Sequence, residues 1–152
     1  MSQTAQLPMK WHNFIVKFGL ILSMLGGIVT AALVVTGELY QMMGVNAAYV
    51  YRYYDGLQML DIMYAVVCVL CSVYAWQTRS AMKDFRRGAP SMLLTLYALN
   101  LGTTLLYNVA VLLLMRAGFS SLSSMGTTVV SSIAAIGLNR TYYQKRAHLF
   151  VH

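Results

Sequence analysis

The stretch FIVKFGLILSMLGGIVTAALVVT, residues 14–36, decides the fold class of this chain. It runs for 23 residues and carries one charge, Lys17. A helix needs about 20 mostly apolar residues to cross the hydrocarbon core of a bilayer. The apolar region of a signal peptide is shorter, about 7–15 residues. The sequence therefore predicts a retained membrane-spanning helix here.

Three further apolar segments of similar length follow this first span. They cover residues 57–76, 91–115 and 119–138, and the last is the richest in Ser and Thr. Short connections between such segments favour antiparallel neighbours. We therefore predict an all-α membrane protein of one domain, residues 1–152, folded as a four-transmembrane-helix up-down bundle.

The overall composition agrees with a membrane protein. The chain is 59% hydrophobic and only 10% charged, whereas soluble domains carry about 25% charged residues. Its net charge of +7 could indicate a nucleic-acid partner. The basic residues stand at the ends of the apolar segments, however, as orientation signals do. We expect the lipid bilayer, and no nucleic acid, as the partner.

The distribution of Lys and Arg predicts the orientation, because cytoplasmic segments carry the excess of basic residues. One side holds Lys10, Lys17, Arg79, Lys83, Arg86, Arg87, Arg140, Lys145 and Arg146, and the other holds Arg52 and Arg116. Both termini are therefore expected in the cytoplasm, with the protein multi-pass in the cell membrane. This orientation gives a tyrosine-rich outer loop 37–56, with a short helix around residues 47–54, and a cytoplasmic loop 77–90. The tail 139–152 is expected to be an interfacial anchor or a solvated helix end.

Small and hydroxyl residues recur at helical spacing in each span. Such stripes mark the sides where transmembrane helices approach closely. In the first span the stripe includes Gly19, Ser23 and Gly27, and in the fourth it includes Ser124, Thr128 and Ser132. The fourth stripe, which also contains Thr127 and Ser131, could serve packing within the chain or an interface between protomers. We therefore expect a homo-oligomer or a membrane-protein partner.

Asp61 is the residue that points most directly to function, because a carboxylate inside a membrane span is costly and often functional. Tyr107 and Asn108 of the third span fall at a similar depth, and Tyr64 lies one turn away. We expect Asp61 to be bonded by Tyr107 and Asn108. A structural hydrogen-bond cluster, or a pair with Arg116 or Arg52, is the alternative.

Two other polar residues extend this predicted cluster. Glu38 closes the first span on the same side and could form a two-carboxylate mouth with Asp61, or be an exposed loop acid. Asn100 lies near the bilayer midplane, where such residues usually bond neighbouring helices.

The pair Cys68 and Cys71 resembles the redox motif in the second helix of the four-helix quinone-linked disulfide oxidases. Here the pair lies near mid-bilayer, the second cysteine pair of those enzymes is missing, and Ser72 and Val73 replace the charged residues after the motif. Two buried cysteines acting as small apolar residues fit better. The three His lack metal spacing. We expect no enzyme activity, no metal and no cofactor.

The tail segment NRTYYQKRAHLF, residues 139–150, and the stretch DGLQMLD, residues 55–61, resemble a group of small four-helix integral membrane proteins of gut Firmicutes. That group has no assigned activity. The resemblance implies a Gram-positive cytoplasmic membrane and brings no mechanism.

Two functions remain open from the sequence. One is a non-catalytic bundle that acts by self-association or as a subunit of a membrane complex. The other is an oligomeric channel or carrier for protons, cations or a small molecule, with Asp61 in a polar outer cavity. We favour association, because the strong polarity is confined to the outer half of the spans.

Overall fold

The computed structural model describes residues 9–115 and 122–151, and every regular element in these residues is helical. In chain order the elements are α1 (Lys10–Phe14), a π-helical turn (Ile15–Gly19), α2 (Leu20–Val35), α3 (Glu38–Met42), α4 (Ala47–Tyr53), α5 (Leu57–Lys83), α6 (Ala89–Met115), α7 (Leu122–Gln144) and a 3-10 turn (Ala147–Leu149). The short helix expected in the outer loop is α4.

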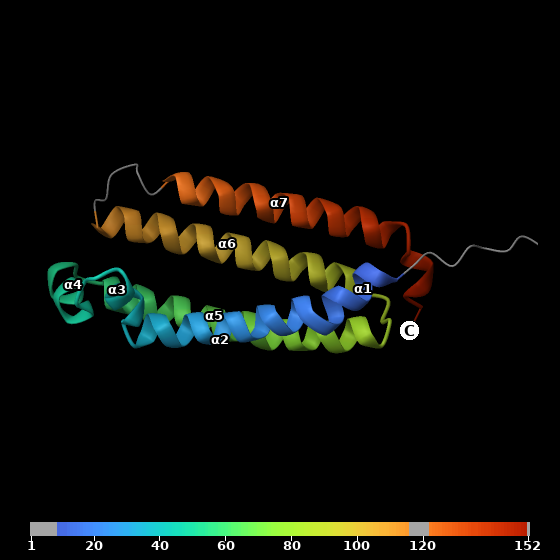
Figure 1. The fold of residues 1–152 in the computed structure, drawn as a ribbon, viewed down its shortest axis with the longest axis horizontal. Coiled ribbons are helices and arrows are strands. Elements are labelled where there is room, and N and C mark those ends of the chain that lie inside the picture. Colours follow the sequence, from blue (N-terminus) through green and yellow to red (C-terminus); the bar gives the residue numbers. More distant parts are fainter. Residues whose placement is uncertain (1–8, 116–121, 152) are drawn as a thin grey trace, which may run out of the picture.

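The long helices α2, α5, α6 and α7 lie alongside one another and alternate in direction (Figure 1). Helix α2 packs on α5, α5 on α6, and α6 on α7. Helices α3 and α4 lie at one end, which we call the loop end. The start of α1 and the C-terminal segment lie at the other. That second end collects the nine basic residues that flank the helices there, and we call it the basic end.

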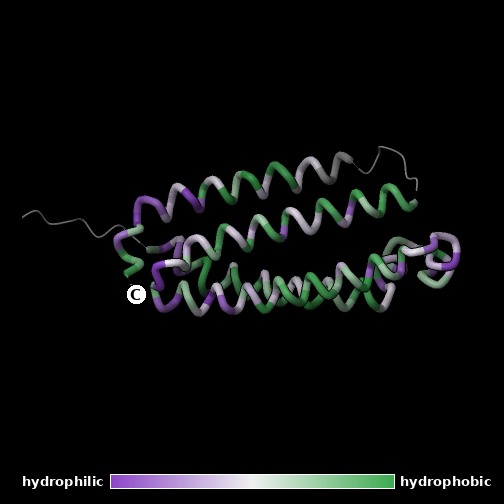
Figure 2. Tube along the Cα trace, turned by 180° about the vertical axis from the view of Figure 1, so that it is seen from behind, coloured by the Kyte–Doolittle hydropathy of each residue, from purple (hydrophilic) through white to green (hydrophobic). Residues whose placement is uncertain are grey.

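Within the described residues, three helical segments are long and apolar enough to cross a membrane: Lys10–Val35, Leu57–Lys83 and Ala89–Met115. Hydrophobic residues occupy the middle of the long helices, and hydrophilic residues gather towards the two ends (Figure 2). The chain is thus a helical protein with the character of a membrane protein. Helix α7 is not among these three segments, and the fourth span remains a prediction.

The second span is longer than the sequence indicated. We expected it to end at Trp76, but α5 continues to Lys83, so that the connection to α6 shortens from 77–90 to residues 84–88. No Gly or Pro interrupts residues 77–87, and a helix can continue past the hydrocarbon core wherever its polar side chains reach water. The length of the apolar segment alone therefore underestimated the length of this helix.

Phe85 ends α5 in an uncommon conformation. Its φ is +51°, where Gly is the usual residue after a helix. Arg86 N donates to Ala81 O at 3.0 Å and Phe85 N to Met82 O at 3.3 Å, which satisfies two carbonyls of the last turn. The Phe85 ring stacks on His12, with ring centroids 4.9 Å apart. This stacking gives the Phe85 side chain a partner, which a glycine at the same position would lack.

The packing of α2 on α5 depends on Gly27. A Cβ at residue 27 would overlap Ser72 Oγ and would come within 3.1 Å of the Cys68 carbonyl oxygen. Gly27 therefore acts as the predicted packing residue, because it lets the two backbones approach. Ser23 is half-buried. The prediction for Gly19 is wrong, since no atom lies within 4 Å of the position its Cβ would take.

The rotation of α7 differs from the one predicted. Ser132 is half-buried as expected, but Thr127, Thr128 and Ser131 are exposed, so the inward placement of Thr128 is wrong. Asn139 and Tyr143, farther along the helix, are only 2% exposed and fix which side faces the protein. Ser131 Oγ donates to the Thr128 carbonyl at 3.1 Å, and such a hydroxyl needs no burial. The side chain of Ser124 lies outside the described residues.

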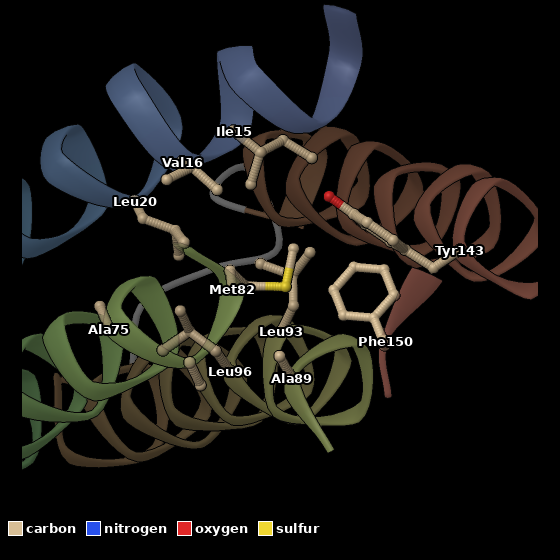
Figure 3. Packing of buried hydrophobic residues seen from close by; sticks show 11 residues of the cluster. Ile15, Val16, Leu20, Ala75, Met82, Ala89, Leu93, Leu96, Tyr143 and Phe150 are labelled. Carbon is tan, nitrogen blue, oxygen red and sulfur yellow. The ribbon is translucent and has the colours of Figure 1, made fainter. Parts of the chain in front are cut away.

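A buried apolar cluster closes the basic end (Figure 3). It joins residues of four helical segments and the tail, all 3% exposed or less: Ile15, Leu20, Met82, Leu93, Leu96, Tyr143 and Phe150. The tail was expected to lie against lipid or water. Tyr143 and Phe150 instead pack into the protein, because the chain turns back after α7 and places Phe150 against Phe85 and Tyr143.

Candidate polar site at the loop end

Asp61 lies in the second turn of α5 and is 1% exposed. Three phenol hydroxyls donate to its carboxylate. Tyr40 and Tyr51 donate to Oδ2 at 2.8 and 2.9 Å, and Tyr107 donates to Oδ1 at 2.8 Å. A carboxylate offers about four lone-pair positions. Most of its acceptor capacity is therefore used by tyrosines.

Two of the three donors come from the loop that connects α2 to α5. Gly37 turns the chain after α2 with φ +73°, and a Cβ there would meet the Cβ of Ala47. Asn46 caps α4 by accepting from Ala48 N at 2.9 Å. These turns bring Tyr40 of α3 and Tyr51 of α4 together edge to face, with ring centroids 5.6 Å apart. The loop is thereby held over the start of α5.

The third donor comes from α6 and is braced by α5. The ring of Tyr107 stacks on Tyr64 with centroids 4.0 Å apart and planes 16° from parallel. Because Tyr64 follows Asp61 by nearly one turn of α5, the stack holds the Tyr107 hydroxyl in line with the carboxylate. The site therefore ties α3, α4, α5 and α6 to one acidic group.

The electrostatics of the site depend on phenols and not on cations. Within the described residues no Lys or Arg nitrogen lies within 4.0 Å of Asp61. Burial, and then the hydrogen bond to Asp61, raises the pKa of Tyr51 to about 12 and that of Tyr40 still higher. Both hydroxyls therefore stay protonated and keep donating at physiological pH. Hydrogen bonds to an ionised acceptor are roughly twice as strong as neutral ones.

The sequence-based prediction for this site is confirmed in part. Tyr107 bonds Asp61 as expected. Asn108 does not, because its amide nitrogen donates to the Thr104 carbonyl at 2.7 Å. Asn100 is half-buried on α6.

The predicted outer mouth is not formed by Glu38 and Asp61. Glu38 is exposed at the start of α3, while Asp61 is enclosed, so the two carboxylates do not share one opening. Arg52 is exposed and lines a pocket of the loop with Tyr49 and Asn46. Arg116 lies outside the described residues.

Sequence reasoning missed Tyr40 and Tyr51, which it placed at the headgroup level with the other loop tyrosines. One signal could have found them. The span around Asp61 carries no Lys or Arg before Arg79, so a buried carboxylate must draw its donors from hydroxyls. The adjoining loop is where tyrosines are densest.

Other candidate groups do not assemble around a common centre. Cys68 and Cys71 are half-buried free thiols on α5. In the described part of the chain no three His, Cys, Asp or Glu side chains lie close enough to hold a metal ion.

A second polar cluster, unforeseen from the sequence, ties the two terminal segments together at the basic end. Trp11 Nε1 donates to Asn139 Oδ1 at 3.0 Å. His12, 3% exposed, has its Nδ1 3.4 Å from the Tyr143 hydroxyl. The Arg146 guanidinium lies 3.8 Å from the centre of the Tyr142 ring. The first two contacts hold α1 against α7, and the third lies within the C-terminal segment.

Comparison with known proteins adds no relative: no family model, no curated protein and no solved structure matches this chain.

Proposed function

We propose that this protein crosses the cell membrane with all four long helices, keeps both termini in the cytoplasm, and acts by association with itself or with a partner subunit, without catalysis. In this arrangement α7 is the fourth span. The likeness to small membrane proteins of gut Firmicutes belongs to the same proposal, and it implies the cytoplasmic membrane of a Gram-positive cell.

The clustering of basic residues supports the orientation. Nine Lys and Arg lie towards the basic end, in the terminal turns of the helices and in the segments next to them, while Arg52 lies in α4 at the other end. Basic segments stay on the cytoplasmic side during insertion. With the basic end inside, the tyrosine-rich loop 37–56 faces outward.

The exposed face of α7 is the observation that carries the association proposal. On this helix the exposed residues include many small ones beside Val130, Ile133 and Leu138, namely Gly126, Thr127, Ser131, Ala134, Gly137 and Thr141. A Cβ at Gly126 or Gly137 would meet no atom within 4 Å. Small residues at such spacing are typical of close contact between membrane helices, and these residues are exposed to the surroundings of the described chain.

The exposed face of α2 is richer in large side chains. It presents Leu22, Leu25, Ile28, Val29 and Val35, each 48% exposed or more. Large aliphatic and aromatic side chains of this sort suit contact with lipid acyl chains. The contrast favours α7, and not α2, as the helix that meets another protein.

The environment of Asp61 favours association over transport. A channel or carrier that used this carboxylate would need it open to water or to a cation. Asp61 is 1% exposed, and three phenols occupy its oxygens. Its role is then to anchor the loop, so the alternative of an oligomeric channel or carrier lacks a pathway through this residue.

Two matched leucine substitutions test the proposal in lipid nanodiscs. Ala134→Leu places a large side chain on the exposed face of α7, and Ala32→Leu does the same on the exposed side of α2. We expect the wild type and Ala32→Leu to have a mass of two or more chains, or of one chain with a bound subunit, and Ala134→Leu to have the mass of one chain. The proposal would be overturned if the wild type had the mass of one chain without a bound subunit, both in nanodiscs and after extraction from native membranes.

A further inference from the structure

A surface pocket of about 490 Å3 lies at the basic end, between the start of α6 and the end of α7. Its polar lining includes Arg87 and Ser91 from the α6 side and Arg140 and Gln144 from α7. Pro90 and Leu94 supply apolar wall. The pocket thus combines two guanidinium groups, from different parts of the sequence, with a hydrophobic surface.

The two arginines of this pocket have no polar partner in the described part of the chain. Among the described residues neither Arg87 nor Arg140 takes part in a hydrogen bond or an ion pair. Asp84 is the one acidic residue of the segments at the basic end, and it pairs with Arg86 at 3.4 Å. Among the described residues no further Asp or Glu at this end is therefore left to neutralise Arg87 and Arg140.

The apolar part of the lining comes from both sides of the polar groups. Pro90 lies at the start of α6 and Phe150 in the tail, while Leu94 follows Ser91 by three residues, about 5 Å farther along the helix. A soluble anion would use only the guanidinium groups. A molecule with a negative head and an apolar body would use both parts of the lining.

We propose that this pocket binds the phosphate headgroup of an anionic phospholipid, with Arg87 and Arg140 holding the phosphate oxygens and Leu94 and Pro90 in contact with the start of the acyl chains. The planar guanidinium fork suits phosphate oxygens. Basic pockets between transmembrane helices on the cytoplasmic side are a known class of anionic-lipid site. The inference rests on the proposed membrane orientation of the basic end, and not on self-association.

The neighbouring pocket provides a natural control. It lies between the end of α5 and the start of α6, has a similar volume of about 480 Å3, and is lined by Trp76, Arg86 and Met92 among others. Its arginine already contacts Asp84. Removing the Arg86 charge therefore lowers the net charge of the same loop without emptying the proposed site.

Native mass spectrometry of the full chain in a neutral detergent tests the proposal, with phosphatidylglycerol or phosphatidylcholine added. We expect the wild type and Arg86→Gln to bind phosphatidylglycerol in preference to phosphatidylcholine. A guanidinium near an anionic headgroup strengthens binding roughly fivefold, so Arg87→Gln/Arg140→Gln should weaken phosphatidylglycerol binding roughly 25-fold. Counting lipids per chain separates this result from the oligomeric state.

Three results would overturn the lipid site. The double variant could keep the preference of the wild type. Arg86→Gln could lose as much affinity as the double variant, which would mean a diffuse charge effect. Inorganic phosphate at low millimolar concentration could displace the lipid, which would mean a site for a soluble anion. If the double variant does not fold, as judged by circular dichroism, Arg87→Lys/Arg140→Lys carries the test. Lysine keeps the positive charge but lacks the planar guanidinium group, so this variant should lose only part of the affinity for phosphatidylglycerol.

Discussion

Asp61 at the loop end and the two arginines of the pocket at the basic end have opposite surroundings. At the loop end one carboxylate, Asp61, is enclosed and accepts from three phenols, with no described cation beside it. At the basic end Arg87 and Arg140 line an open pocket and contact no acid in the described chain. Asp61 is satisfied within the chain, whereas Arg87 and Arg140 leave charge for their surroundings.

This difference implies a role in the stability of the fold for Asp61 and a role in ligand binding for the two arginines. A buried charge that has all its partners in the protein stabilises the fold and is closed to ligands. An exposed charge without partners adds little to folding and is free to attract lipid. We therefore expect mutations at the loop end to change stability, and mutations of Arg87 and Arg140 to change binding.

The largest effect is expected for Asp61. Asp61→Ala removes the acceptor that Tyr40, Tyr51 and Tyr107 share, and at about 1 kcal/mol for each lost hydrogen bond the free energy of unfolding should fall by about 3 kcal/mol. Asp61→Asn keeps one acceptor oxygen and should cost less. The measurement is equilibrium unfolding in mixed micelles.

Asp84→Ala is the matched control at the other end. Its pair with Arg86 is exposed, with half or more of each side chain open to solvent, so the free energy should change by less than about 0.5 kcal/mol. Equal losses for Asp61→Ala and Asp84→Ala would break the distinction between the two ends.

A smaller effect is expected for Tyr51→Phe, which removes one of the three donors and should cost about 1 kcal/mol at neutral pH. A further effect on stability is expected at alkaline pH. Because folding raises the pKa of Tyr51 from 10.0 to about 12, the folded state holds this proton more tightly. The stabilisation is complete below pH 10.0 and is lost as the pH rises to about 12.

Tyrosinate absorbance measured against pH checks this assignment. The wild type should show a late titration step that Tyr51→Phe reduces. If Tyr51→Phe does not alter the late step, Tyr51 does not donate to a buried acid.

The smallest effect on stability is expected for Arg87→Gln/Arg140→Gln in neutral detergent. Neither arginine contacts a described partner, and surface changes of this kind usually shift the free energy of unfolding by no more than about 0.5 kcal/mol. Thermal unfolding with and without phosphatidylglycerol is the measurement. The lipid should stabilise the wild type more than the variant. A large loss without lipid would instead give these arginines a structural role.

Sequence patterns predicted those features that depend on helical periodicity. Asp61 and Tyr107 fall on the inward stripes of their spans, and their hydrogen bond follows from two antiparallel helices at matching depth. Gly27 was found because small residues recur every four positions. Each of these inferences needs only the 3.6-residue repeat and the direction of the neighbouring helix.

Features that depend on loops and helix ends were not predicted. Tyr40 and Tyr51 reach Asp61 only because Gly37 and Asn46 turn the loop back over α5, and no periodic pattern records such a turn. The predicted rotation of α7 was wrong at Thr128. Asn139 and Tyr143 pack against α1 and the tail, and both lie beyond the apolar segment that was considered. The length of α5 was underestimated because hydropathy falls before the helix ends.

By itself, the sequence determined that this chain is helical and suited to a bilayer, because hydropathy adds up along a segment and does not depend on what the segment touches. It also determined which end of the molecule is basic. The tertiary structure decided which hydroxyls satisfy Asp61, which face of α7 stays open, and that Arg87 and Arg140 share one pocket. Those outcomes depend on residues far apart in sequence meeting in space, and only the packed chain brings them together.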